Sequence, residues 1–183
     1  MKKIIKYLLS GLTACMLTAC TSYKTITGNI HESVSTMFYQ FTVEDCYSTL
    51  AIGEHKPEDG KMFVVVSVTI ENTYKGKLSL TDHHFQLQTL SSSDDEENSE
   101  STASASSDIS YVLPLSGSYL ADELPSSYDL EQSETKKGTL VFEMPATETV
   151  FNFCSADYFN YGSSTSSPST GNTYFVQITP EAR

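Results

Sequence analysis

The sequence has no tryptophan and few cysteines. Of its four cysteines, Cys15 and Cys20 stand near the start, which leaves Cys46 and Cys154 in the body of the chain. This pair has neither a CxxC pattern nor the spacing of metal ligands, which argues against a zinc site. Long runs with helical periodicity are also scarce, whereas glycine and proline recur at short intervals and tyrosine occurs eleven times. These features favour an all-β fold over an α/β fold.

Basic residues are outnumbered by acidic residues, 11 against 23, for a formal net charge of −12. If residues 1–19 are removed, three lysines and no acid leave with them, which gives 8 basic and 23 acidic residues and a net charge of −15. Such a surface repels phosphate groups. We therefore expect no nucleic acid partner and no electrostatic docking on anionic lipid, since both depend on basic residues that displace counterions.

Motifs of known catalytic chemistry are missing from the sequence: it contains no GxSxG, no HExxH, no glycine-rich phosphate loop and no Rossmann fingerprint. Residues 133–136 match the SxxK of penicillin-interacting enzymes, but they lead directly into a predicted strand and have no SDN or KTG motif to accompany them. His83 and His84 are neighbours, and on a strand they would point to opposite faces and could not bind one metal ion together. We therefore expect no enzyme, no catalytic residue, no metal and no cofactor.

The first nineteen residues have the features of an export signal. Lys2, Lys3 and Lys6 make a positive start, and Tyr7 to Leu17 is an apolar stretch interrupted only by small or hydroxyl residues. A transmembrane helix needs roughly 20 predominantly apolar residues, so this stretch is too short to span a membrane comfortably.

The four residues that end this leader, Leu17-Thr18-Ala19-Cys20, resemble the lipobox of bacterial lipoproteins. The resemblance implies that the Cys20 thiol carries a diacylglyceryl group and that Cys20 becomes the mature N-terminus. The same letters end at Cys15, but cleavage there would leave an apolar core just under the roughly 7 residues that a signal usually needs. We therefore predict an extracytoplasmic protein that is held to a membrane by lipid at Cys20, and the sequence leaves open which membrane that is.

The rest of the chain is long enough for one domain of ordinary size, and 39% apolar residues are enough for a single core. We expect a flexible tether over residues 20–36, because this polar stretch cannot bury enough surface to fold by itself. A domain over residues 37–183 follows. Within it, residues 91–108 contain eight serines and the acidic run 94–97, and we expect a solvated loop. A calcium site there is disfavoured because the EF-hand spacing is absent.

The stretch Gly60–Asn72 predicts a central strand. Val64, Val66 and Val68 fall on one face together with Met62 and Ile70, and that face should lie in the core. The other face begins apolar with Phe63 and Val65 and then turns polar, so only half of it should be covered. This pattern is typical of a strand in a β-sandwich.

Further strands are predicted around this one. Gly138–Met144 should turn Leu140, Phe142 and Met144 inward and Thr139, Val141 and Glu143 outward. About seven strands with frequent turns describe an immunoglobulin-like antiparallel β-sandwich. By strand alternation, Cys46 lies on the face opposite Phe41 and Val43, and Cys154 on the face opposite Phe151 and Phe153. Since an exported chain meets an oxidising environment, we predict a disulfide between Cys46 and Cys154, with two free thiols as the alternative.

The segments GKMFVVVSVTIENTYKGKLSLTDHHFQLQ and ETKKGTLVFEMP resemble an uncharacterised family of bacterial secreted lipoproteins that carry an immunoglobulin-like β-sandwich domain. The resemblance covers roughly Phe41 to Cys154. It departs from the family at Gln132-Ser133-Glu134, where a Pro-Gly turn is common, and at the acidic serine-rich loop, which looks like an insertion. The resemblance implies a fold and a location, and no enzymatic activity or cofactor.

These observations predict a lipid-anchored module with a non-enzymatic binding or structural role at the cell envelope. The domain should be a monomer, attached to the membrane through Cys20, with an envelope protein as its expected partner. The main alternative is an accessory or solute-binding lipoprotein of a transporter or envelope complex, and a more distant one is a hydrolase. A pocket lined with buried polar groups would favour solute binding, and a nucleophile within hydrogen-bond reach of a base would favour the hydrolase.

Overall fold

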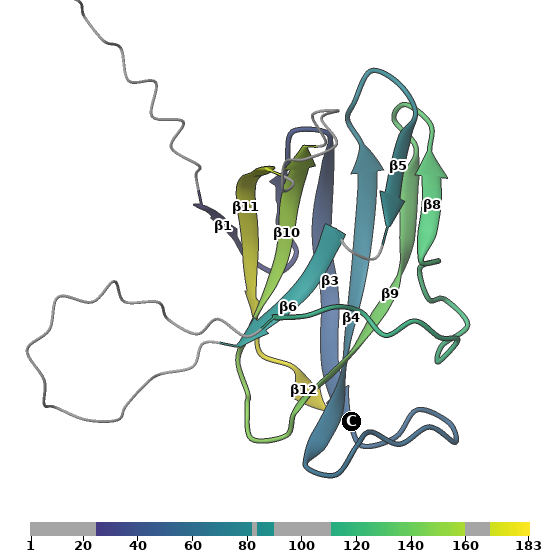
Figure 1. Ribbon diagram of the computed structural model, residues 1–183, viewed down its shortest axis with the longest axis vertical. Helices are drawn as coiled ribbons and strands as arrows, with labels where there is room; N and C mark the ends of the chain where they lie inside the picture. Colours follow the sequence, from purple (N-terminus) through teal and green to yellow (C-terminus); the bar gives the residue numbers. More distant parts are fainter. Residues whose placement is uncertain (1–24, 82–83, 90–110, 160–168) are drawn as a thin grey trace, which may run out of the picture.

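The computed structural model describes residues 25–81, 84–89, 111–159 and 169–183. Cys20 and the acidic serine-rich loop lie outside the described residues, and so does His83. Within the described residues the chain forms twelve strands (Figure 1), which are β1 (Thr25–Gly28), β2 (Ser33–Ser35), β3 (Tyr39–Thr49), β4 (Lys61–Asn72), β5 (Leu78–Thr81), β6 (Phe85–Thr89), β7 (Tyr111–Val112), β8 (Ser127–Leu130), β9 (Thr135–Pro145), β10 (Phe151–Phe159), β11 (Ser169–Ile178) and β12 (Glu181–Ala182).

The strands form two five-stranded sheets and a smaller pair. Sheet A has the order β1-β11-β10-β6-β7, and sheet B has the order β12-β3-β4-β9 with β2 also paired to β3. Strands β5 and β8 pair with each other. Pairing is antiparallel except at two edges, where β1 joins β11 and β12 joins β3 in parallel. The predicted immunoglobulin-like β-sandwich is confirmed, with more strands than the seven expected, because several short strands line the sheet edges.

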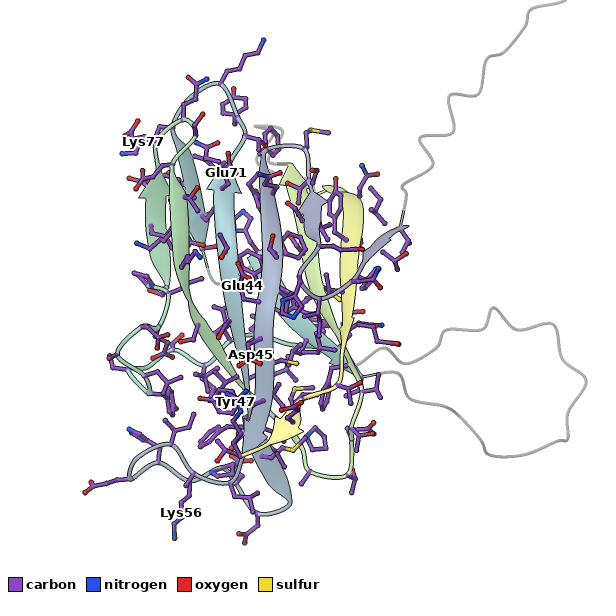
Figure 2. All side chains as sticks on the ribbon, turned by 180° about the vertical axis from the view of Figure 1, so that it is seen from behind. Glu44, Asp45, Tyr47, Lys56, Glu71 and Lys77 are labelled. Atoms are coloured by element: carbon purple, nitrogen blue, oxygen red, sulfur yellow. The ribbon has the colours of Figure 1, made fainter. Side chains whose placement is uncertain are left out.

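Strand β4 is the centre of sheet B, as its sequence pattern predicts. It pairs with β3 from Phe63 to Asn72 and with β9 from Lys61 to Glu71. Its predicted inner face lies in the main core, where Val64, Val66 and Ile70 are fully buried. On its outer face Phe63 and Val65 are buried in a separate cluster. The polar half of the outer face carries Glu71 beside Gln40, and Glu44 of β3 lies lower on the same face (Figure 2).

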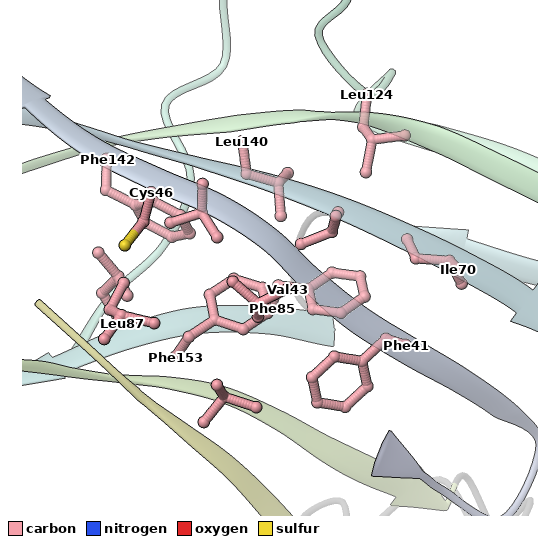
Figure 3. Packing of buried hydrophobic residues seen from close by; sticks show 14 of the residues in the cluster. Phe41, Val43, Cys46, Ile70, Phe85, Leu87, Leu124, Leu140, Phe142 and Phe153 are labelled. Atoms are coloured by element: carbon pink, nitrogen blue, oxygen red, sulfur yellow. The ribbon is translucent and has the colours of Figure 1, made fainter. Parts of the chain in front are cut away.

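The main core between the sheets is rich in aromatic rings. Phe41 and Phe142 of sheet B face Phe85 and Phe153 of sheet A (Figure 3). The ring centroids of Phe85 and Phe153 are 5.6 Å apart in a stacked arrangement, and Phe41 meets both rings edge-on at 6.0 Å. Burial of such rings supplies the largest apolar area per residue, so this cluster holds the two sheets together.

The prediction of a flexible tether up to Thr36 is wrong for its described part. Strand β1 pairs with β11 from Thr25 to Gly28, and β2 pairs with β3 from Ser33 to Ser35. Val34 is 4% exposed and belongs to the main core, and Ile26 packs against it. Single apolar residues in a polar stretch suffice here because the sheet edges supply the hydrogen bonds that the segment could not make alone.

A β-bulge in strand β3 overturns the predicted position of Cys46. The register with β4 shifts between Val43 and Asp45, so that Glu44 is the extra residue. Since a bulge reverses the alternation beyond it, Cys46 points into the interior on the same side as Phe41 and Val43 (Figure 3). Strand alternation after the bulge therefore differs from the predicted one.

The predicted disulfide between Cys46 and Cys154 is also wrong, because both cysteines are free and buried. Cys46 lies between the two sheets. Cys154 is paired with Phe175 and Gln86 on the neighbouring strands of sheet A and points away from the core that holds Phe153. A disulfide would have to pass through sheet A, which its short bond geometry does not allow.

Candidate functional site

A second apolar cluster lies on the outer face of sheet B, at the half of β4 that the sequence predicts to be covered. Four buried residues form it, and partly buried side chains from other parts of the chain pack on it. The buried members are Ile52, Phe63, Val65 and Val141, and the partly buried ones are Tyr47, Leu115, Tyr119 and Leu120. Three of these come from the connection between β7 and β8, so this connection is the cover.

The β7–β8 connection, residues 113–126, is held along β9 by backbone hydrogen bonds. The N–H of Leu115 donates to the carbonyl of Val141 at 2.7 Å, and that of Leu124 donates to the carbonyl of Thr139 at 2.9 Å. The N–H of Thr139 donates in turn to the carbonyl of Asp122 at 2.9 Å. These bonds occupy part of the outer edge of sheet B, an edge that would otherwise be open to pairing with another strand.

The connection approaches β9 so closely that only glycine fits opposite it. A Cβ on Gly138 would lie 2.7 Å from Cδ2 of Leu124 and 2.9 Å from the carbonyl oxygen of Asp122. Real side chains do not approach this closely, so any other residue at 138 would push the connection away. The glycine of the KKGTLVF segment is therefore required by the close packing of the connection on β9, which the sequence alone does not reveal.

Glu123 stabilises the turn within this connection. Its Oε2 accepts hydrogen bonds from the N–H of Tyr119 at 2.7 Å and from the N–H of Leu120 at 3.4 Å. The Tyr119 ring is thereby held against Phe63, at 5.6 Å between centroids, and against His55, at 4.8 Å. The carboxylate is occupied by its own turn, which orders the apolar side chains beside it.

A hollow of about 440 Å³ lies between this connection and β9. We call it the β9 hollow, and its lining residues are Pro114, Leu115, Ser116, Gly117, Ser118, Leu120, Ala121, Glu123, Leu124, Pro125, Ser126, Leu140 and Val141. The lining combines apolar side chains with small hydroxyls, main-chain groups and one carboxylate. Its volume falls within the range of roughly 300–1,000 Å³ that is typical of ligand sites.

No pattern in the sequence points directly to the β9 hollow. Residues 113–126 contain proline, glycine and serine in an irregular order, which predicts only a loop or a short edge strand. An indirect signal was the apolar start of the outer face of β4, since Phe63 and Val65 need a cover. The alternation of β4 predicts that a cover is needed but does not predict which segment provides it.

Asn72, the last residue of β4, joins two turns at one end of the sandwich. Its buried Nδ2 lies 2.8 Å from the carbonyl of Gly76, 2.9 Å from that of Leu130 and 3.0 Å from that of Glu131. Its Oδ1 accepts a hydrogen bond from the N–H of Tyr74 at 2.8 Å, as the turn chemistry predicts. This amide therefore ties the β4–β5 turn to the β8–β9 turn.

The other residues weighed in the sequence are not brought together into a reactive group. Ser133 lies in the β8–β9 turn with φ of 62°, and Lys136 lies on β9 over the ring of Tyr128 at 5.5 Å, so the SxxK match is not on a helix. Nδ1 of His84 lies 3.1 Å from the N–H of Thr81. Among the described residues, no group of three or more His, Cys, Asp or Glu side chains is placed to hold a metal ion.

Burial keeps both cysteines in their protonated form. Desolvation raises the pKa of Cys154 far above its usual value and raises the pKa of Cys46 as well, with Asp45 adding to the rise at Cys46. A thiol is nucleophilic only as the thiolate. Neither side chain is therefore prepared for nucleophilic chemistry at neutral pH.

The described residues include no helix with the length and hydrophobicity that a membrane span requires. The predicted lipid site at Cys20 lies outside the described residues.

Comparison with solved structures finds similar chains at low sequence identity. The chain is similar to a Bacillus subtilis protein described as "a putative lipoprotein (ycdA)", at 17% identity and a TM-score of 0.49. The similarity covers 80% of this chain and 38% of the length of that protein. It is also similar to an uncharacterized β-sandwich protein from Clostridium difficile, at 14% identity and a TM-score of 0.45, covering 86% of this chain and 96% of the other. The yjhA protein of Bacillus subtilis is 15% identical, with a TM-score of 0.46, over 69% of this chain and 78% of the other.

Among the curated proteins no significant match is found. A family model described as "Domain of unknown function (DUF4352)" matches residues 28–163. The matched range begins at the end of β1 and includes β9 with its covering connection. Because the match covers well over half of the sequence, the chain belongs to the DUF4352 family.

Proposed function

We propose that this protein is an extracytoplasmic lipoprotein whose β-sandwich binds a partner protein of the cell envelope and catalyses no reaction. The lipid is carried by Cys20, behind the basic and apolar leader. The partner inserts an apolar side chain and its adjoining backbone into the β9 hollow. The observation that carries the binding role is the hollow itself, a space of about 440 Å³ between residues 113–126 and β9.

The composition of the hollow supports recognition of a protein segment. Leu115 and Leu120 offer apolar contact, while the exposed Ser118 and Ser126 offer hydroxyl groups. Such a mixture suits a peptide, which presents side chains and backbone groups together. The backbone bonds from the connection to β9 hold the lining in place before any partner arrives, which lowers the entropic cost of binding.

Uptake of a small solute is the second candidate, because the volume of the hollow also matches that of small-molecule sites. It corresponds to an accessory or solute-binding lipoprotein of a transporter. A solute would raise the melting temperature of the purified protein when a low-molecular-weight extract is added, whereas a protein partner would leave it unchanged until a macromolecular fraction is supplied.

The test compares Ala121→Arg with Ala146→Arg in the full-length, lipidated protein. Both alanines are exposed, but Ala121 lines the hollow and Ala146 follows β9 away from it. We expect cross-linking to one envelope protein in the wild type and in Ala146→Arg, and its loss in Ala121→Arg. Equal cross-linking of both variants would refute the hollow as the binding site.

Membrane attachment is tested separately with Cys20→Ala. We expect this variant to leave the membrane fraction after high-salt and carbonate washing, since acyl chains contribute about 0.8 kcal/mol per buried methylene and the variant carries none. Retention of Cys20→Ala in the washed membranes would refute the lipid anchor and would leave the question of the hollow open to its own test.

A further inference from the structure

The end of the sandwich at which β3 begins exposes apolar side chains. The turns 36–38 and 73–77 lie side by side there, because the N–H of Thr73 donates to the carbonyl of Phe38 at 3.1 Å. Met37 is 54% exposed and Tyr74 is 47% exposed, and the Tyr74 ring meets Phe38 edge-on at 5.6 Å. We call Met37, Phe38, Tyr74 and the adjacent Lys75 the tip.

The tip is rigidly supported from below. Phe38 packs against the main core, and the Oδ1 of Asn72 holds the N–H of Tyr74 at 2.8 Å. Asn72 is itself fully buried and tied to the β8–β9 turn. The exposed side chains of Met37 and Tyr74 are therefore presented on fixed backbone, which is unusual for apolar residues with no cover within the described part of the chain.

The chain enters the domain at the level of this tip. Ile26 of β1 is the register partner of Tyr174, which is the partner of Ser155, and the Ser155 hydroxyl lies 2.5 Å from the hydroxyl of Tyr39. Tyr39 is the first residue of β3 and directly follows the turn that carries Met37. The start of β1 and the tip are thus at the same end of the sandwich.

The segment between the predicted lipid and β1 is short. Only residues 21–24 separate Cys20 from Thr25, the first residue of β1. At no more than about 3.6 Å per residue, an extended chain could carry Thr25 only about 18 Å away from Cys20. A domain tethered so closely cannot turn freely, and the end from which β1 starts stays near the bilayer.

We propose that the tip is a membrane-contact surface, in which Met37, Phe38 and Tyr74 rest in the interface of the phospholipid bilayer that holds the anchor. This inference depends on the lipid anchor at Cys20 proposed above. Tyrosine is favoured at the headgroup level, where its ring is in an apolar zone and its hydroxyl is hydrated. The Lys75 ammonium can reach the phosphates from beside Tyr74.

Apolar contact, and not net charge, drives this docking. Lys77 lies at the same end (Figure 2), but its ammonium is paired with Asp129 at 2.7 Å. Glu131 and Glu134 of the β8–β9 turn add acidic charge nearby. The tip would therefore bind bilayers weakly on its own, and the lipid at Cys20 supplies the local concentration that makes the contact persist.

The test uses the absence of tryptophan from the sequence. Full-length lipidated protein is reconstituted in vesicles of phosphatidylcholine and phosphatidylglycerol that carry brominated acyl chains, with a single tryptophan introduced in each variant. Tyr74→Trp and Met37→Trp report on the tip. Leu50→Trp is the matched control, since Leu50 is 67% exposed just after the end of β3, at the opposite end of the sandwich.

We expect both tip variants to lose tryptophan emission in brominated vesicles and to shift their emission to shorter wavelength. The Leu50→Trp control should keep its emission in the same vesicles. Equal emission from tip and control would overturn the membrane-contact surface, provided that flotation shows the protein on the vesicles. Failure of the wild-type protein to float would overturn the anchor itself, and with it the inference that rests on the anchor.

Discussion

The two faces of sheet B are both apolar where β4 and β9 meet, but they are covered in different ways. On the inner face, Phe142 lies in a core that sheet A closes with its own aromatic rings. On the outer face, Val141 lies in a small cluster that an irregular connection closes. Phe142 and Val141, which are adjacent on β9, thus belong to two different hydrophobic clusters, one closed by a sheet and the other by a loop-like connection.

The difference shows where the stability of the fold resides and why we place the proposed binding site beside the outer cluster. The inner core is built from strand pairs distant in the sequence, so its side chains are packed from every direction. The outer cluster is covered by a connection without regular secondary structure, which backbone hydrogen bonds tie to β9 and whose turn the Glu123 carboxylate stabilises. Regions with such sparse support open locally at lower free energy than the rest of a fold, and they are where binding sites are commonly found.

The largest expected effect on stability comes from substituting two adjacent residues of β9, one on each face of sheet B. Phe142→Ala should lower the free energy of unfolding by about 3–5 kcal/mol, because it removes a ring and leaves a cavity between the sheets. Val141→Ala should lower it by about 1.5 kcal/mol, since it deletes two buried methyl groups at about 0.8 kcal/mol each. Urea denaturation of both variants measures the two losses. Equal losses would mean that the outer cluster is as important to stability as the core.

An intermediate effect is expected from Gly138→Ala. The new Cβ would displace Leu124 and the Asp122 carbonyl, and overpacking of this kind costs typically about 1–3 kcal/mol. Hydrogen exchange should then be faster at the N–H groups of Leu115 and Leu124, while β4 amides keep their protection. Gly76→Ala is the control, because a Cβ there would meet Tyr74 only at an ordinary 3.7 Å. Unchanged exchange at Leu115 and Leu124 would show that the connection adapts without opening.

Sequence periodicity predicted both faces of β4 and β9 because these strands follow strict alternation without interruption. The inward set of β9, Leu140, Phe142 and Met144, lies in the main core as expected, and the outward Val141 lies in the outer cluster. A period of two is a local property, so a local pattern can reveal it. The fold class follows from the same signal.

The features that were missed depend on contacts distant in the sequence. The polar residues of β1 gain order from parallel pairing with β11, nearly 150 residues later. The bulge at Glu44 shifts one residue against β4, and alternation cannot reveal a shift of that kind. Beside the β9 hollow, Gly138 of β9 admits Leu124 of the connection between β7 and β8, a fit between two segments that are apart in the sequence. None of these has a signature within a short window.

The smallest expected effect concerns the two buried thiols. Cys46 points into the main core, and Cys154 is buried on the face of sheet A that points away from it. Burial raises both pKa values, so that neither forms much thiolate between pH 7 and pH 8, and alkylation of the native protein should be slow. In denaturant without reductant, the intact mass of a protein produced from residue 21 onward, which retains only Cys46 and Cys154, should show two alkyl groups per chain.

Reductant should accordingly leave the urea midpoint of the native protein unchanged. A disulfide between these cysteines would close a loop of about 100 residues and would contribute about 4.7 kcal/mol to stability in the chain-entropy model. Reduction of such a bond would therefore lower the urea midpoint clearly. A falling midpoint, or a mass without alkyl groups, would show that the strands of sheet A and sheet B move far enough for Cys46 and Cys154 to meet. That result would also weaken the distinction between a rigid inner core and a more easily opened outer cover, because it requires the inner core to open.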